Sequence, residues 1–83
     1  MSVDKLLTER NSTHGDFSAN ALVSQSLKYI IRSYSSGMPS QIQREALDMI
    51  CLKISRIVTG DPNFKDHWDD IAGYATLAAK DCK

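Results

Sequence analysis

The chain has 83 residues, with 10 Lys or Arg and 10 Asp or Glu, so its formal net charge at pH 7 is zero. This balance argues against the broad phosphate-binding surface that duplex DNA requires, and the length indicates a single domain with a small core. No signal-peptide pattern and no run of about 20 apolar residues is present. We therefore expect a cytoplasmic protein that binds neither membranes nor nucleic acids.

The two cysteines bear on how so small a domain is stabilised. Cys51 lies in an apolar helical run and Cys82 is the penultimate residue, with no spacing typical of a zinc site. Two unmatched thiols are typical of a reducing compartment. Short chains are usually reinforced by disulfides, metals or self-association, so we expect a homo-oligomer, and a dimer in particular.

The amino-terminal half predicts two helices. Ser2 can cap a short helix over about residues 3–9, which is followed by a run of turn-forming residues at 10–16. A longer amphipathic helix is expected over about 17–35. Its apolar residues recur every three or four positions and are Leu22, Val23, Leu27, Ile30, Ile31 and Tyr34.

The third helix is expected over about 40–59. Ser40 and Gln43 have the spacing of a capping box, and Gly60 follows the last apolar residue. The helix is apolar on more than one side, which is typical of a central helix flanked by neighbours from its own chain or from a second copy. This pattern is the main sequence argument for a dimer.

The fourth helix is expected over about 64–80, with Asn63 as its cap after an Asp-Pro turn. Trp68 falls on the apolar side with several alanines, which indicates a core position, while the acidic residues fall on the other side. The predicted fold class is therefore all-α. It is a small bundle of three main helices plus a short N-terminal helix, in one domain spanning 1–83 and completed by self-association.

Two acidic pairs suggest a metal site. Glu45 and Asp48 lie one turn apart on the third helix, and Asp66 and Asp69 lie one turn apart on the fourth. If these faces met, the four carboxylates would require a cation, and magnesium, or manganese, is the natural one. The alternative is ordinary, because acidic residues at this spacing usually form a solvated helix face.

These motifs resemble the all-α nucleoside triphosphate pyrophosphohydrolases of the MazG type. That resemblance implies a helical bundle that dimerises, binds magnesium through the four carboxylates and cleaves a nucleoside triphosphate to a monophosphate and pyrophosphate. It also implies catalytic roles for Glu45 and for Asp70, the latter as general base. Arg44 stands where the family motif has its first glutamate, and three of the four matched acids are aspartates.

A second resemblance covers nearly the whole chain. The phrases Thr13-His-Gly-Asp-Phe17, Gly60-Asp-Pro62 and Asp66-His-Trp-Asp-Asp-Ile-Ala-Gly-Tyr74 are similar to a family of small phage and prophage proteins of unknown function. That family resembles a short relative of the MazG group. The resemblance implies a phage-encoded protein that acts in the host cytoplasm.

A triphosphate needs cationic partners, and the candidates are His14, Lys28, Lys53 and Arg56. The lysines and arginine are more often used in surface ion pairs, and the Thr-His-Gly-Asp run is more often a loop whose Asp16 or Thr13 caps the next helix. For Asn20 and Gln25 the alternatives are contact with a base edge, contact with the water shell of the metal, or solvent, which is the commonest.

Two functions follow from these observations. The first is magnesium-dependent binding of a nucleoside triphosphate, with pyrophosphohydrolysis as the reaction if the protein is an enzyme. The alternative is a non-catalytic phage protein that binds or inhibits a host protein or sequesters a nucleotide. Stabilisation by magnesium, with or without nucleotide, separates the two.

Overall fold

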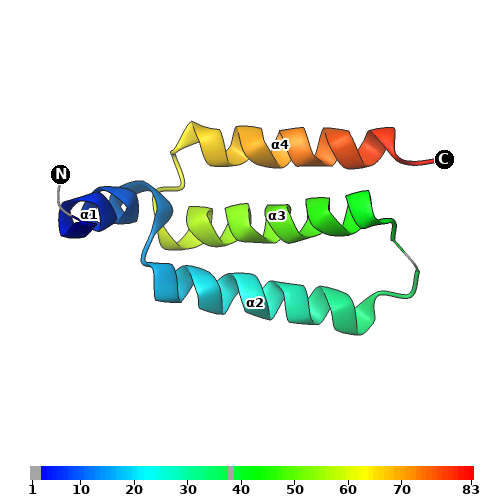
Figure 1. The fold of residues 1–83 in the computed structure, drawn as a ribbon, viewed down its shortest axis with the longest axis horizontal. Helices are drawn as coiled ribbons and strands as arrows, with labels where there is room; N and C mark the ends of the chain where they lie inside the picture. Colours follow the sequence, from blue (N-terminus) through cyan, green and yellow to red (C-terminus); the bar gives the residue numbers. More distant parts are fainter. Residues whose placement is uncertain (1–2, 38) are drawn as a thin grey trace.

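The computed structural model describes residues 3–37 and 39–83, and every regular element in these ranges is a helix. The elements are α1 (Val3–His14), α2 (Phe17–Tyr34), α3 (Gln41–Thr59) and α4 (Lys65–Lys80). Helices α2, α3 and α4 lie side by side in one layer with α3 in the middle, and neighbours run antiparallel (Figure 1). The predicted all-α fold class is confirmed.

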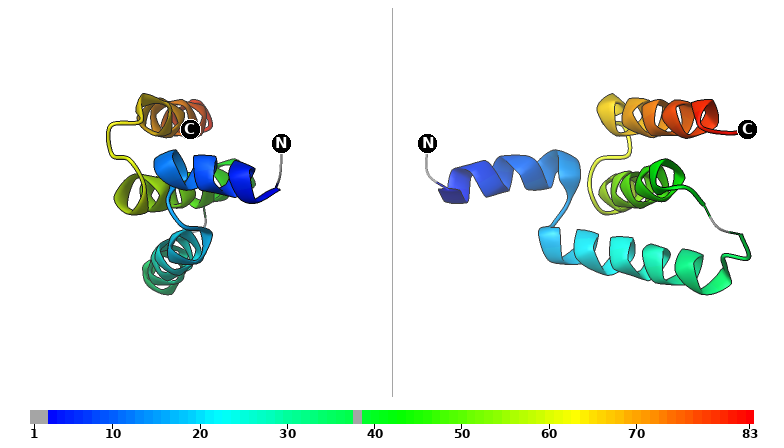
Figure 2. Two further views of the ribbon diagram at one scale, coloured as in Figure 1. Left: turned by 90° about the vertical axis from the view of Figure 1, so that its left-hand side faces the viewer. Right: turned by 45° about the vertical axis from the view of Figure 1, so that its right-hand side comes forward.

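Helix α1 projects from one end of this layer, as Figure 1 and the right-hand view of Figure 2 show. The radius of gyration is 14.3 Å, against about 12 Å for a compact chain of this length. Fully buried hydrophobic residues among those described are limited to Ala46, Cys51 and Ile57. The layer is therefore held by a thin core along α3.

Helix α1 is longer than predicted, because it continues to His14 instead of ending near residue 9. The polar residues of the expected turn bond back to the helix itself: Ser12 donates to the carbonyl of Glu9, and Thr13 to that of Arg10. Gly15, with a φ of 80°, then ends the helix. The expected cap, Ser2, lies outside the described residues.

The helix caps are partly as predicted. The Asp16 carboxylate accepts a hydrogen bond from the Ala19 amide at the start of α2, and Ser40 and Gln43 form the expected capping box at the start of α3. The prediction for α4 is wrong. Its cap position is Phe64, and the Asn63 amide instead donates to the Asp61 carboxylate within the turn.

Helix α3 has the central position that its apolar pattern predicts. Helices α2 and α4 of the same chain cover its two sides (Figure 1). The pattern is therefore accounted for within one copy and does not by itself require a partner.

Helix α4 packs through a different face from the predicted one. Trp68 is 53% exposed, with its indole N–H donating to the Pro62 carbonyl, whereas His67 is only 1% exposed. The side that faces α3 carries His67, Ile71, Tyr74 and Ala78, and its centre lies about 70° from that of the predicted stripe, with which it shares Ile71 and Ala78. The alanines of that stripe gain little from burial, so polar contacts of His67 and Asp70 decide the rotation.

No described helix is both long and apolar enough to span a membrane.

Candidate anion-binding site

A pocket of about 260 Å³ opens where α1, α2 and α3 meet. Its wall holds four cationic or titratable nitrogen-bearing side chains and no carboxylate. These four are Arg10 and His14 from α1, Lys28 from α2 and Arg56 from α3. The remainder of the wall is apolar or uncharged and consists of Leu7, Asn11, Gly15, Phe17, Asn20, Ala21, Ser24, Gln25 and Leu52.

The turn between α1 and α2 fixes the geometry of this pocket. An added Cβ at Gly15 would lie 2.3 Å from Thr59 Oγ1 and 2.7 Å from the Thr59 carbonyl carbon, so the turn contacts the end of α3 directly. The amide of Asp61 donates to the carbonyl of Thr13, at 3.2 Å. The contact of Gly15 with Thr59 and the hydrogen bond from Asp61 to Thr13 therefore hold the end of α1 against the end of α3.

Asn20 is the polar residue that joins the turn to both long helices. Its amide nitrogen donates to the carbonyls of His14 and Asp16, and its amide oxygen accepts from the hydroxyls of Ser55 and Thr59. The side chain is buried and both polar atoms of its amide group have partners, although the Ser55 and Thr59 hydroxyls also donate to the carbonyls of Leu52 and Ser55. Asn20 is therefore a structural residue and does not read a base edge.

The pocket cations are not neutralised by neighbouring acids. Within the described residues, Arg10, Lys28 and Arg56 form no ion pair, although the chain has ten acidic residues. Partial burial and the nearby Arg10 guanidinium lower the pKa of Arg56, and only Asp70 acts in the opposite direction. Like charges gathered without a partner favour the binding of an anion.

Ser24 gives a second, independent indication of a ligand. The residue is 3% exposed and lines the pocket, yet its hydroxyl has no hydrogen-bond partner among the described residues. A buried hydroxyl without a partner costs about 1–3 kcal/mol. A ligand oxygen in the pocket would remove this cost by accepting a hydrogen bond from the hydroxyl.

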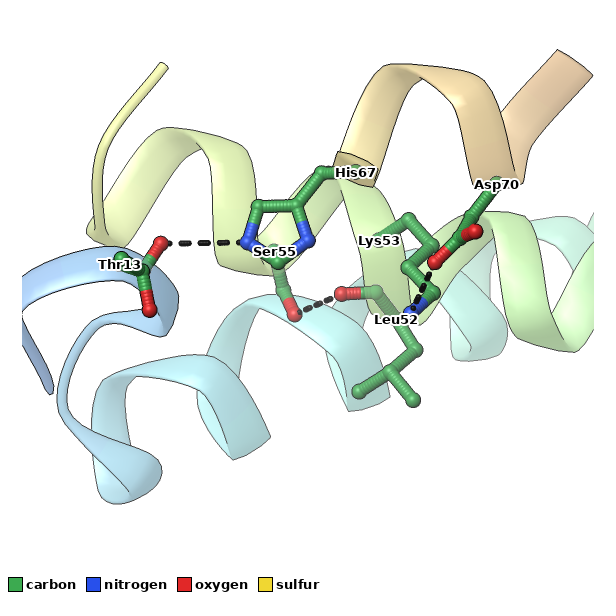
Figure 3. Close-up of polar contacts among 6 residues, drawn as sticks. All are labelled: Thr13, Leu52, Lys53, Ser55, His67 and Asp70. Carbon is green, nitrogen blue, oxygen red and sulfur yellow. Dashed lines mark hydrogen bonds and ion pairs between the residues drawn. The ribbon is translucent and has the colours of Figure 1, made fainter. Parts of the chain in front are cut away.

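His14 lies between the pocket and a cluster of rings. Its ring centroid is 4.7 Å from that of His67 and 5.7 Å from that of Phe64, and its Nδ1 is 2.5 Å from Thr13 Oγ1. His67 reaches back from α4, and its Nε2 lies 3.1 Å from the Thr13 carbonyl oxygen (Figure 3). The cluster connects α4 to the pocket wall.

The carboxylates of the predicted metal site are not brought together. Because α3 and α4 are antiparallel, the Lys53–Asp70 ion pair of 2.9 Å sets their register, and Figure 3 shows it beside His67. Asp48 lies five residues from Lys53 toward one end, and Asp66 lies four residues from Asp70 toward the other. At about 1.5 Å per residue, nine residues separate these two acids by roughly 13 Å along the helices.

The individual contacts agree with this separation. Asp48 lies on the α2 side of α3, 3.9 Å from Arg32, while Asp69 pairs with Lys65 on its own helix. Glu45 and Asp66 are exposed. No group of three or more His, Cys, Asp or Glu residues that could hold a metal ion occurs within residues 3–37 and 39–83. The expectation that the four acids converge within one copy is therefore wrong.

Asp70, the predicted base, is engaged in its ion pair. A hydrogen bond from the Lys53 ammonium holds the pKa of Asp70 below its usual range. A carboxylate with a lowered pKa is a weaker base.

Comparison with known proteins places the chain in a family. Residues 2–81 match the family described as domain of unknown function DUF6378. The chain belongs to this family. No curated protein and no solved structure matches it.

For this DUF6378 member, the structure gathers three of the four predicted phosphate-binding residues, His14, Lys28 and Arg56, around one pocket. The fourth, Lys53, is turned to Asp70.

Two further wall residues, Arg10 and Ser24, were not singled out from the sequence. Helical spacing is the sequence feature that could have indicated them. Arg10 and His14 lie four residues apart and share a face of α1, and Asn20, Ser24 and Lys28 share a face of α2 in the same way. The composition of residues 10–16 predicts a turn, and a helical spacing of Arg10 and His14 does not follow from a turn.

Proposed function

We propose that this protein binds the phosphate groups of a nucleotide in the pocket between α1, α2 and α3. The observation that carries the proposal is the meeting of Arg10, Lys28 and Arg56 at one concave site without an acidic residue in its wall. Guanidinium groups match phosphate geometry through paired hydrogen bonds, and a lysine adds a point charge. The unpartnered Ser24 hydroxyl supplies a neutral donor inside the site.

The size and lining of the pocket favour phosphate inside it and the nucleoside at its rim. Its volume of about 260 Å³ is slightly below the range of roughly 300–1,000 Å³ for small-molecule sites. Phe17 borders the pocket and is 82% exposed, so its ring offers a stacking surface to a base. The resemblance to MazG-type enzymes supports a nucleoside triphosphate as the ligand.

Pyrophosphohydrolysis is a further proposal with less support. It requires magnesium or manganese at Glu45, Asp48, Asp66 and Asp69, and these acids do not form a donor set within one copy. A second copy would have to bring acids together. We therefore propose binding or sequestration of the nucleotide as the function, and hydrolysis as a separate outcome that experiment can detect.

Self-association is likewise proposed, together with a phage origin and action in the host cytoplasm. Large apolar side chains are exposed along the side of α2 opposite α3, including Leu22, Tyr29 and Ile30. Such a surface is typical of a contact with another protein chain. We expect a dimer mass by sedimentation equilibrium at micromolar concentration, and a monomer mass across the accessible concentration range would contradict this.

Binding is tested by thermal unfolding and calorimetry with pyrophosphate, a set of nucleoside triphosphates and inorganic phosphate, each in EDTA and in magnesium. We expect stabilisation in EDTA, of about 2.7 kcal/mol at a hundred times the dissociation constant. Sodium chloride of equal ionic strength is the control, because nonspecific screening acts through ionic strength alone. Absence of stabilisation by pyrophosphate and by every triphosphate at low salt would overturn the proposal. Pyrophosphate release in magnesium would add hydrolysis to it.

A further inference from the structure

His14 is the one wall residue of the pocket whose charge changes near neutral pH. The charged or titratable groups around it come from three helices and are all cationic or neutral. They are Arg10 on α1, Lys53 and Arg56 on α3, and His67 on α4. Asp16, two residues along the chain, caps α2, and Asp70 pairs with Lys53.

These surroundings favour the neutral form of the His14 imidazole when no anion is bound. Burial lowers the pKa of His14 from its ordinary value, and the positive charges of His67, Arg56, Arg10 and Lys53 lower it further. Its Nδ1 is within hydrogen-bond distance of Thr13, and its Nε2 has no partner in the described residues. One ring nitrogen is therefore available to a ligand.

An anion in the pocket reverses the electrostatic effect of the surroundings on the protonation of His14. A phosphate placed among Arg10, Lys28 and Arg56 neutralises the charges that oppose protonation, and it adds an attraction for an imidazolium on the same wall. A protonated His14 can then donate to a phosphate oxygen as a charge-assisted hydrogen bond.

We propose that His14 takes up a proton when a phosphate ligand enters the pocket, so that the pocket binds phosphate more tightly as the pH falls from 8 toward 6. This inference rests on the proposed function, because it concerns the same site and the same ligand class. It adds that binding is linked to pH through one residue of the wall and does not depend on a metal ion.

The direction in which affinity changes with pH depends on the pKa of His14 in the free protein and in the complex. In the free protein the pKa is lowered, so the ring is neutral through the upper part of this pH range. In the complex the pKa is raised, so protons are bound on complex formation in the window between the two values. Affinity is then greatest below the window and decreases as the pH rises through it.

The test is an NMR titration of the two histidine Cε1–H signals against pH, in EDTA, with and without saturating pyrophosphate. We expect pyrophosphate to raise the pKa of His14. Sequential assignment distinguishes the His14 signal from that of His67, whose ring centroid lies 4.7 Å from that of His14. This measurement needs no variant and is independent of folding effects.

The affinity for pyrophosphate also depends on pH because pyrophosphate itself titrates. A calorimetric comparison of wild type with H14Q corrects for this contribution, because the ligand is the same for both proteins. We expect the ratio of the affinities at pH 6 and pH 8 to be about tenfold larger in wild type than in H14Q, the effect of one charge-assisted bond. If pyrophosphate binds but the His14 titration and this ratio do not change, the inference is overturned and the proposed function stands. If pyrophosphate does not bind at any pH between 6 and 8, the proposed function fails first.

Discussion

We expect the replacement of Arg56 with glutamine to weaken pyrophosphate binding by about ten- to a hundredfold. Hydrogen bonds to charged groups contribute about 1.5–3 kcal/mol, and Arg56 is the pocket cation contributed by the central helix. Glutamine keeps a polar side chain of similar reach but removes the charge and the forked donor geometry. Isothermal calorimetry in EDTA at low salt measures the change.

The stability of R56Q separates a binding role from a structural role. Arg56 is partly buried next to Arg10, and this environment lowers its pKa, so its charge is held at a cost to the folded state. We expect R56Q to unfold at a temperature equal to or slightly above that of wild type while its affinity decreases. Marked destabilisation of R56Q would instead assign Arg56 a structural role.

Arg44→Gln is the matched control, because Arg44 is on the same helix, is exposed and does not line the pocket. It changes the net charge of the protein by the same amount. An equal loss of affinity in R44Q and R56Q would show that pyrophosphate responds to overall charge and not to this pocket, which would contradict the site assignment.

Gly15→Ala has the largest expected effect on folding. The φ of 80° is unfavourable for alanine, and the added Cβ would overlap both the side chain and the backbone of Thr59. Backbone strain and overpacking each cost about 1–3 kcal/mol, so we expect a loss of roughly 2–5 kcal/mol. The free energy of unfolding of a domain of this size is about 4–12 kcal/mol, so the loss would unfold a protein at the lower end of this range and markedly destabilise one at the upper end. Urea denaturation followed by circular dichroism measures the loss.

Gly73→Ala is the corresponding control. Gly73 lies within α4, and nothing lies within 4 Å of an added Cβ. Alanine at an open helical position should stabilise the protein by about 0.5–1 kcal/mol. If G15A and G73A had similar stabilities, the close contact between the first turn and the end of α3 would be wrong.

The pocket is formed by residues that lie far apart in the chain, so helical spacing does not indicate it, and helical spacing likewise does not decide whether the two acidic pairs meet. Helical spacing places Glu45 near Asp48 and Asp66 near Asp69, but it says nothing about which ends of two helices meet. A short turn between α3 and α4 makes them antiparallel, so acids near the start of each helix are separated. The same topology brings Arg10 and Arg56, 46 positions apart in the sequence, into one wall.

The face of α4 illustrates the same limit on a smaller scale. Hydrophobic periodicity favoured Trp68 as a core residue, yet His67 is buried because it contacts Thr13 and the rings of His14 and Phe64. Periodicity ranks residues by apolarity alone. Periodicity therefore cannot indicate that a histidine is buried because one of its ring nitrogens forms a hydrogen bond with a carbonyl distant in the sequence.

The sequence by itself determined the helical class, the extents of α2 and α3, the cap at Ser40 and the central position of α3. These features depend on neighbours within about four residues, or on how apolar a helix is overall, and both can be read along a chain. Only the tertiary structure decided the extent of α1, the packed face of α4, the separation of the carboxylates and the gathering of the cations. Those depend on the antiparallel register and on the contact of Gly15 with Thr59, which join segments that local spacing does not relate.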